Sequence, residues 1–137
     1  MNKKSFIFDI KTVYDQRGCL SSLETNMDIP IEINRIFYMH HVISDRGGHA
    51  HIDTDQVIIA MSGTFKIKLF DGIDTEEYVM DNCTKGLYVP RLIFIDLYDF
   101  SSDAICLVLA NTHYDMRKSL RNMQDFLEYI QNNKPNE

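Results

Sequence analysis

The sequence lacks the features that would indicate a secreted, membrane-bound or nucleic-acid-binding protein. Its three cysteines, Cys19, Cys83 and Cys106, are widely spaced and form no CxxC pair, so we expect reduced thiols rather than a disulfide framework. The formal net charge of -6 disfavours a nucleic-acid surface. The first apolar run, Phe6-Ile7-Phe8, ends at Asp9 and is too short for a signal peptide or a membrane span. These absences predict a cytoplasmic protein that binds neither nucleic acid nor membrane.

The sequence does have the length and pattern of one β-rich domain. Its 137 residues, 45% of them hydrophobic, are enough to bury a core, and we expect a single domain over residues 1–137. Short runs of β-branched and aromatic residues alternate with turn signals such as Ser62-Gly63 and Asp71-Gly72. About nine strands up to Ala110 are predicted, which favours an all-β barrel or sandwich.

The pattern changes near Asp115. From there, apolar residues recur at intervals of three and four, which predicts an amphipathic helix ending at about Ile130. We expect this helix to pack on its own barrel or across a dimer interface.

The densest titratable chemistry lies in Arg46-Gly47-Gly48-His49-Ala50-His51. Two histidines one residue apart in a strand point to the same face. Three interpretations are open: hydrogen-bonded structural histidines, a metal site, or metal-free acid–base catalysis. Imidazoles titrate near neutral pH, so one can accept a proton while the other donates one.

The metal interpretation rests on Gly47-x-His49-x-His51, which resembles the first motif of the cupins, a class of small jelly-roll barrels. A cupin metal site would add an acidic residue, here Asp55, and a later histidine. The segment Gly86-Leu87-Tyr88-Val89-Pro90 resembles the later motif, but no histidine follows it up to Tyr98. Two histidines and one short carboxylate fall below the three or four ligands that a transition metal requires, so we expect neither metal nor cofactor.

The acid–base interpretation needs a base that removes a proton beside a carbonyl and a donor that neutralises the enolate oxygen. Arg17, Arg35 and Arg46 could hold a diphosphate in such a site.

Taken together, the motifs resemble the sugar 3,4-ketoisomerase family, the WxcM-like cupins of the FdtA and QdtA type. The resemblance covers nearly the whole chain. It is carried by the stretch from Arg46 to His51 and by Asp15-Gln16-Arg17-Gly18-x-Leu20, Asp28-Ile29-Pro30, Asn34-Arg35-Ile36-Phe37-Tyr38, Gln56-Val57, Ser62-Gly63, Asp71-Gly72, Gly86-Leu87-Tyr88-Val89, Tyr98-Asp99-Phe100-Ser101, Val108-Leu109-Ala110 and Tyr114-Asp115.

The resemblance implies a cupin-type jelly roll with a C-terminal amphipathic helix. It also implies an isomerase that moves the ketone of dTDP-4-keto-6-deoxyglucose from C4 to C3 without a metal. By the family pattern His49 and His51 are the acid–base residues, with His49 expected to move the carbon-bound proton and His51 to serve the oxygens. A 4,6-dehydratase would supply the substrate, and a PLP aminotransferase would use the 3-keto product to make a 3-amino sugar. We also expect a homodimer.

The family pattern implies substrate-binding residues as well. Arg35 and Arg46 would hold the diphosphate or position the sugar, and Tyr38 and Gln56 would contact the substrate. Arg17 resembles the branch that makes the galacto, fucose-like product.

The chain also departs from the family. The usual Trp-His pair is Phe94-Ile95, the first of two tyrosines is Phe37, and Met116-Arg117-Lys118-Ser119 replaces a usual acidic segment. Three alternatives remain open: a metal-dependent cupin enzyme, a cupin that binds nucleotide sugars without turnover, and a 3,5-epimerase. Metal content, dTDP binding without proton exchange, and double exchange at C3 and C5 would distinguish them.

Overall fold

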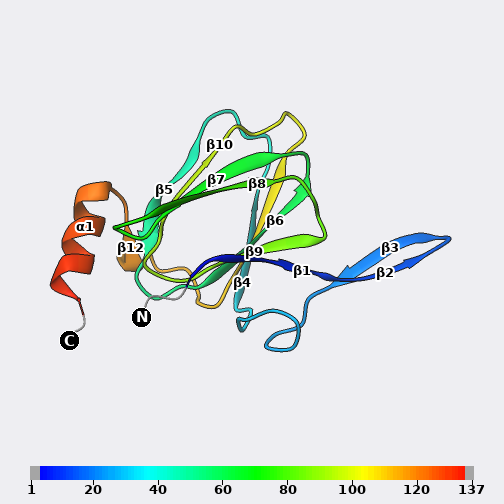
Figure 1. The fold of residues 1–137 in the computed structure, drawn as a ribbon, viewed down its shortest axis with the longest axis horizontal. Helices are drawn as coiled ribbons and strands as arrows, with labels where there is room; N and C mark the ends of the chain where they lie inside the picture. Colours follow the sequence, from blue (N-terminus) through cyan, green and yellow to red (C-terminus); the bar gives the residue numbers. More distant parts are fainter. Residues whose placement is uncertain (1–3, 135–137) are drawn as a thin grey trace.

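In a computed structural model, which describes residues 4–134, the chain folds into two five-stranded antiparallel sheets packed face to face (Figure 1). The first sheet has the order β1 (Phe6–Asp9), β9 (Lys85–Val89), β6 (Gln56–Ser62), β11 (Ile105–Ala110) and β4 (Arg35–Met39). The second has the order β12 (Ser119–Leu120), β5 (Arg46–His51), β10 (Phe94–Tyr98), β7 (Phe65–Phe70) and β8 (Thr75–Met80).

The main core fills the space between these sheets. The first sheet contributes residues such as Ile58 and Leu87, and the second contributes Phe65, Ile67 and Ile95. Each such side chain stabilises the fold by about 1.5–3 kcal/mol on burial. The expected all-β cupin-type jelly roll is therefore confirmed, although no hydrogen-bonded ladder joins the two sheets within residues 4–134.

A second core covers the outer face of the first sheet. Val57 and Ile59 of β6 pack there against Ile29 and Ile31 of the segment between β3 and β4. Because β6 is covered on both faces, its sequence is a continuous apolar run rather than an alternating one.

The C-terminal helix forms, but it begins later than the periodicity predicts. A 3-10 turn over Met116–Lys118 and β12 come first, and α1 spans Met123–Asn132. The expected start near Asp115 is wrong because Ser119 and Leu120 are drawn into pairing with β5. Asn122 then caps the helix by accepting a hydrogen bond from the Asp125 N–H at 2.8 Å. No helix within residues 4–134 has the length and apolar character that crossing a membrane would require.

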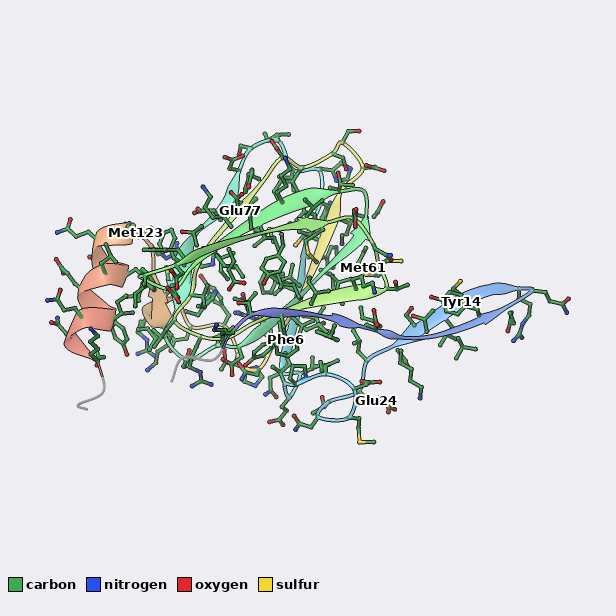
Figure 2. The ribbon with its side chains drawn as sticks, in the orientation of Figure 1. Phe6, Tyr14, Glu24, Met61, Glu77 and Met123 are labelled. Carbon is green, nitrogen blue, oxygen red and sulfur yellow. The ribbon has the colours of Figure 1, made fainter. Side chains whose placement is uncertain are left out.

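Two strands lie apart from both sheets. β2 (Lys11–Asp15) and β3 (Gly18–Ser22) pair with each other and project from the sandwich as a hairpin, on which Tyr14 is seen in Figure 2. Val13, Tyr14 and Leu20 are 55–68% exposed on it. An isolated two-stranded hairpin is at best marginally stable in water.

Candidate active site

The two histidines of β5 share the face that looks into the space between the sheets. Ala50 between them is fully buried on the outer face, where it packs against Phe126 of α1. Residues on either side of it point the opposite way. The His49 and His51 rings lie 4.9 Å apart, centroid to centroid, at an interplanar angle of 82°. The predicted shared face is therefore confirmed.

A close approach between β5 and β10 fixes the position of this strand. Gly47 has a φ of +87°, and a β-carbon there would lie 2.6 Å from the Ile95 carbonyl oxygen. Only glycine allows both the backbone conformation and this contact. The same ladder pairs Ile95 with His49, and cross-strand partners share a face. An aliphatic side chain therefore lies beside His49, at the position where the family pattern commonly has a histidine.

His51 is held neutral by its surroundings. Burial lowers its pKa to about 4, and the electrostatic effects of His49 and Arg35 act in the same direction, against the opposing charge of Asp53. Its Nε2 atom is buried and has no hydrogen-bond partner within residues 4–134. A neutral imidazole with an unpaired ring nitrogen can accept or relay a proton from a bound ligand.

The lowered pKa of His51 predicts a dependence of stability on pH. Between pH 6.5 and about 4 the unfolded chain binds a proton at this site and the folded chain does not, so stability falls as the pH falls. We expect His51 to account for a loss of up to about 3 kcal/mol over this window. Urea denaturation at several pH values should show a smaller loss for His51→Asn than for wild type. An equal dependence of the free energy of unfolding on pH in the two proteins would contradict this prediction, because every other titratable group is present in both.

Arg35 is a cation that the fold places close enough to the histidines to act on His51. It shares the inward face of β4 with Phe37, and its guanidinium lies over the rings of Phe37 (5.1 Å) and Tyr114 (5.3 Å). Burial lowers the pKa of Arg35, and its Nε atom has no partner among the described residues. A buried donor without a partner indicates a position that a bound group can use.

Two further residues lie next to this group and were not among the predicted site residues: Tyr114, which contacts Arg35, and Arg121, which acts on His51. The Tyr114 hydroxyl accepts a hydrogen bond from Arg121 Nη2 at 3.3 Å, and the charge of Arg121 acts on His51. β12, which immediately precedes Arg121, pairs with β5, so Ser119 lies opposite His51. Tyr114 falls in a block that matches the family pattern, whereas no sequence signal indicates Arg121.

Gln56 joins this interior group. It is 4% exposed and is the first residue of β6, where it lies between Val89 and Ala110 of the neighbouring strands. It shares the inward face of its strand with Ile58. His49, His51, Arg35 and Gln56 therefore face one interior space.

The other three predicted substrate-binding residues are not brought to this space within one chain. Tyr38 is 62% exposed on the opposite face of β4 from Phe37. Arg46 begins β5, whereas His51 ends it. Arg46 and Tyr38 both line a surface hollow of about 230 Å³. Arg17 lies in the turn of the projecting hairpin, ion-paired to Asp15 at 2.7 Å. Their substrate contacts stay predictions.

Asp55, the carboxylate that the metal alternative requires, has structural partners. It is 6% exposed and accepts hydrogen bonds from the Arg91 backbone N–H (2.8 Å), the Arg91 guanidinium and the Asn111 amide (3.1 Å). No group of three or more histidines, cysteines or acidic residues within residues 4–134 is placed to hold a metal ion. The donor set of the metal alternative is therefore not assembled here.

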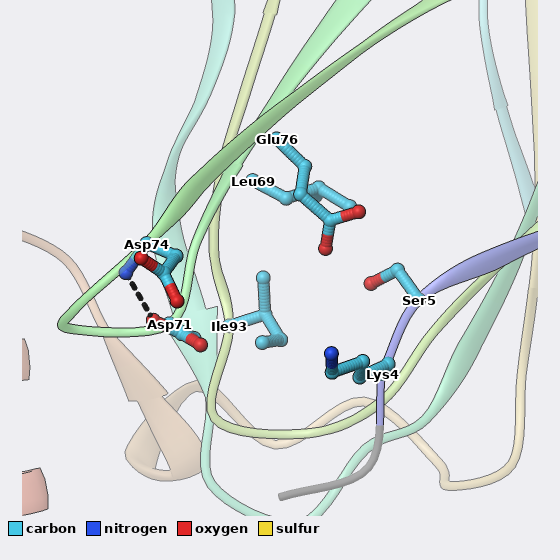
Figure 3. A pocket seen from close by; sticks show the side chains of 7 residues that line it. All are labelled: Lys4, Ser5, Leu69, Asp71, Asp74, Glu76 and Ile93. Carbon is cyan, nitrogen blue, oxygen red and sulfur yellow. Dashed lines mark hydrogen bonds between the residues drawn. The ribbon is translucent and has the colours of Figure 1, made fainter.

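A second hollow, of about 220 Å³, has the wrong charge for a diphosphate. Asp71, Asp74 and Glu76 line it with Lys4 as the only cation in the lining (Figure 3). The Asp71 carboxylate accepts a hydrogen bond from the Asp74 N–H at 2.7 Å, which shapes the turn beside it. Three carboxylates repel an anionic ligand.

Comparisons with a family model and with a curated relative identify the family. The FdtA family model, described as WxcM-like, C-terminal, matches residues 3–131. The TDP-4-oxo-6-deoxy-alpha-D-glucose-3,4-oxoisomerase of Aneurinibacillus thermoaerophilus is 34% identical over 90% of this chain and 91% of its own.

Two solved structures from Campylobacter jejuni are similarly close. WlaRA, a TDP-fucose-3,4-ketoisomerase, superposes with a TM-score of 0.90 at 33% identity, over 96% of this chain and 98% of its own. WlaRB, a TDP-quinovose 3,4-ketoisomerase, superposes with a TM-score of 0.88 at 36% identity, over 93% and 99%.

Proposed function

Because the chain belongs to the FdtA (WxcM-like) family of sugar 3,4-ketoisomerases, we propose that it moves the ketone of TDP-4-keto-6-deoxyglucose from C4 to C3. The observation that supports this reaction best is the pair of imidazoles on one face of β5, 4.9 Å apart, facing an interior shared with Arg35 and Gln56. The reaction needs two groups that exchange protons with adjacent carbons and oxygens, and this pair can supply them.

The proposed chemistry passes through an enediol. His49 removes the proton from C3 and the C3–H electron pair forms the C3–C4 double bond, while the C4 carbonyl oxygen, O4, takes up the negative charge. His51 carries the O3 proton across to O4, and His49 returns its proton to C4 as the C3 ketone forms. Atoms and charge balance without an external oxidant. The Arg35 cation stabilises negative charge that develops on the oxygens, and Gln56 holds the sugar.

Proton exchange tests this reaction. Incubation with TDP-4-keto-6-deoxyglucose in deuterium oxide should place deuterium at C4 of a new 3-keto sugar, seen by NMR. Absence of both exchange and a new keto sugar would refute the isomerase. Tight TDP binding without exchange would indicate a nucleotide-sugar-binding cupin instead.

The proposed product has the galacto configuration at C4. Relatives named for TDP-fucose and for TDP-quinovose are about equally similar to this chain, so the support for galacto is Arg17, which matches the fucose-like branch. The NMR coupling between H4 and H5 distinguishes the two outcomes, because it is small in a galacto product and large in a gluco product.

The proposed enzyme is a homodimer that exchanges its hairpins. The β2–β3 hairpin exposes Val13, Tyr14 and Leu20, and β4 is an edge strand with Ile36 60% exposed. Edge strands and bare apolar hairpins in soluble proteins are usually covered. A hairpin packed along β4 of a second copy would cover both surfaces and bring Arg17 to the partner's site.

Mixed dimers test this arrangement. Arg17→Ala and His49→Asn should each inactivate the enzyme, but in a heterodimer one site receives both intact residues. Co-expression should therefore restore about a quarter of wild-type activity, from the half of the dimers that are mixed. No recovery in a preparation that light scattering shows to be dimeric would place Arg17 in its own subunit's site, and a monomeric protein would refute the dimer.

The proposed pathway position follows from the substrate and product. A 4,6-dehydratase makes a 4-keto-6-deoxy sugar, and a PLP aminotransferase converts a 3-keto sugar to a 3-amino sugar. The proposed location is the cytoplasm, in keeping with three free cysteines of which two are exposed.

A further inference from the structure

The arginines of this chain are held in two different ways. Arg17, Arg91 and Arg117 each form an ion pair with an aspartate. Arg35 and Arg121 form no ion pair with any carboxylate of residues 4–134. These two arginines lie at the end of the sandwich that contains His51, and aromatic groups contact them instead of acids.

Arg35 is held by two aromatic rings. Its guanidinium lies over the rings of Phe37 (5.1 Å) and Tyr114 (5.3 Å). An aromatic face attracts a guanidinium and sets the orientation of its plane. A carboxylate would also orient it, but it would cancel much of the positive charge. The rings therefore leave Arg35 with its charge and its N–H donors available, as the stabilisation of a developing oxyanion requires.

Tyr114 lies on a segment, residues 111–118, that crosses from β11 in the first sheet to β12 in the second. The carbonyl of its first residue accepts a hydrogen bond from the Asn34 side-chain amide at 2.8 Å. The carbonyl of its last residue accepts one from the Ile52 N–H at 2.9 Å. The segment is therefore attached to both sheets, beside the start of β4 and the end of β5.

The Tyr114 ring is fixed at its hydroxyl as well. The side chain is 62% exposed, so surrounding protein does not enclose it. Arg121 Nη2 donates a hydrogen bond to the hydroxyl at 3.3 Å. Arg121 directly follows β12, in which Ser119 pairs with His51. The group that holds the ring is therefore attached to the strand that carries the histidines.

We propose that Tyr114 is a positioning residue for Arg35, and that Arg121 is a positioning residue for Tyr114. Together they keep the Arg35 guanidinium directed into the interior space, with its charge free to act on the enolate oxygen. This inference rests on the proposed function and adds two residues to it that act through Arg35.

Steady-state kinetics with TDP-4-keto-6-deoxyglucose tests the role of the ring. Tyr114→Leu removes the aromatic face, so kcat should fall about 10-fold. KM should stay within about twofold of wild type, because Arg35 acts on charge that develops only in the transition state. Tyr114→Phe keeps the ring and loses the hydroxyl, so its kcat should fall by about threefold. A raised KM with unchanged kcat would overturn the proposal.

Combined variants test whether these residues act through one another. In an Arg35→Ala background, Tyr114→Leu should cause no further loss of kcat. The same fold loss with and without Arg35 would overturn the proposal. Adding Tyr114→Phe to Arg121→Ala should likewise cause no further loss, because both changes remove the same hydrogen bond. Multiplying losses would separate Arg121 from Tyr114 and overturn its assigned role.

Arg117→Ala is the matched control for Arg121→Ala. Arg117 lies on the same segment as Tyr114, but its side chain is 89% exposed and pairs with Asp115. Its removal should leave kcat at the wild-type value. Equal losses of kcat in the two variants would show a general disturbance of the segment and would overturn the proposal.

The NMR resonance of the Arg35 Nε–H provides a measurement that does not depend on activity. Ring currents from Phe37 and Tyr114 act on this group, so Tyr114→Leu should move its resonance and Arg117→Ala should not. A resonance that stays in place in Tyr114→Leu would overturn the proposal.

The failure of this inference is distinguishable from failure of the isomerase. If wild type exchanges deuterium at C4 but Tyr114→Leu keeps its kcat, the isomerase stands and the positioning proposal is wrong. If Tyr114→Leu moves the Arg35 resonance but wild type never exchanges deuterium, the contact of Tyr114 with Arg35 stands and the ketoisomerase is wrong.

Discussion

Replacing His49 by asparagine should lower turnover of TDP-4-keto-6-deoxyglucose by about 10²–10⁴-fold, the usual contribution of a general acid–base residue. Asparagine fills a similar space and can form hydrogen bonds, but it cannot take a proton from carbon near neutral pH. Because asparagine keeps much of the space and hydrogen-bonding capacity of the imidazole, TDP affinity should stay within about threefold of wild type. NMR of deuterium incorporation and calorimetry of TDP binding measure the two effects.

His113→Asn is the matched control, because His113 is exposed and lies outside the site described here. It should match wild type in both assays. Turnover by His49→Asn within a few fold of wild type would remove His49 from the chemistry. A joint loss of turnover, TDP affinity and urea stability would show damage to the fold instead of a specific catalytic loss.

The second large effect is on stability. Asp55→Ala should lower the free energy of unfolding by about 3 kcal/mol, because it leaves the Arg91 backbone N–H, the Arg91 guanidinium and the Asn111 amide without their shared acceptor. These contacts join the residue before β6, the segment after β9 and the residue after β11. Urea denaturation followed by circular dichroism measures the change.

Asp9→Ala is its control. Asp9 also forms an ion pair, with Lys85, but its side chain is 82% exposed, and exposed pairs contribute at most about 1 kcal/mol. Similar losses for the two variants would mean that the buried network around Asp55 has no special structural role.

The sequence predicts which face of a strand a side chain occupies where the residues on the two faces differ in chemical character. In the His49-Ala50-His51 stretch, alternation predicted the shared face, which the structure has. In Arg35-Ile36-Phe37-Tyr38, either alternate set contains an aromatic residue, so the sequence does not indicate that Arg35 and Phe37 face inward while Tyr38 faces outward. That orientation depends on packing of Phe37 against the main core.

Interactions between segments that are distant in the sequence account for the features that the sequence did not predict. The helical spacing of apolar residues runs continuously from Met116. Ser119 instead pairs with His51, which lies much earlier in the chain, so the first predicted turns of the helix do not form. Arg121 reaches the site through the same pairing. Asp55 fits the spacing of a metal ligand in the sequence, and only the fold brings Arg91 and Asn111 to it.

The contact between Gly47 and β10 also bears on how this enzyme could be redesigned or could diverge. The spacing of the two strands is set by the backbone carbonyl of Ile95, not by its side chain. Position 47 should therefore tolerate no exchange, whereas position 95 can vary in chemistry without displacing the strand that carries the histidines. New product selectivity could then arise by single substitutions at position 95, while the strand that carries the catalytic histidines keeps its position.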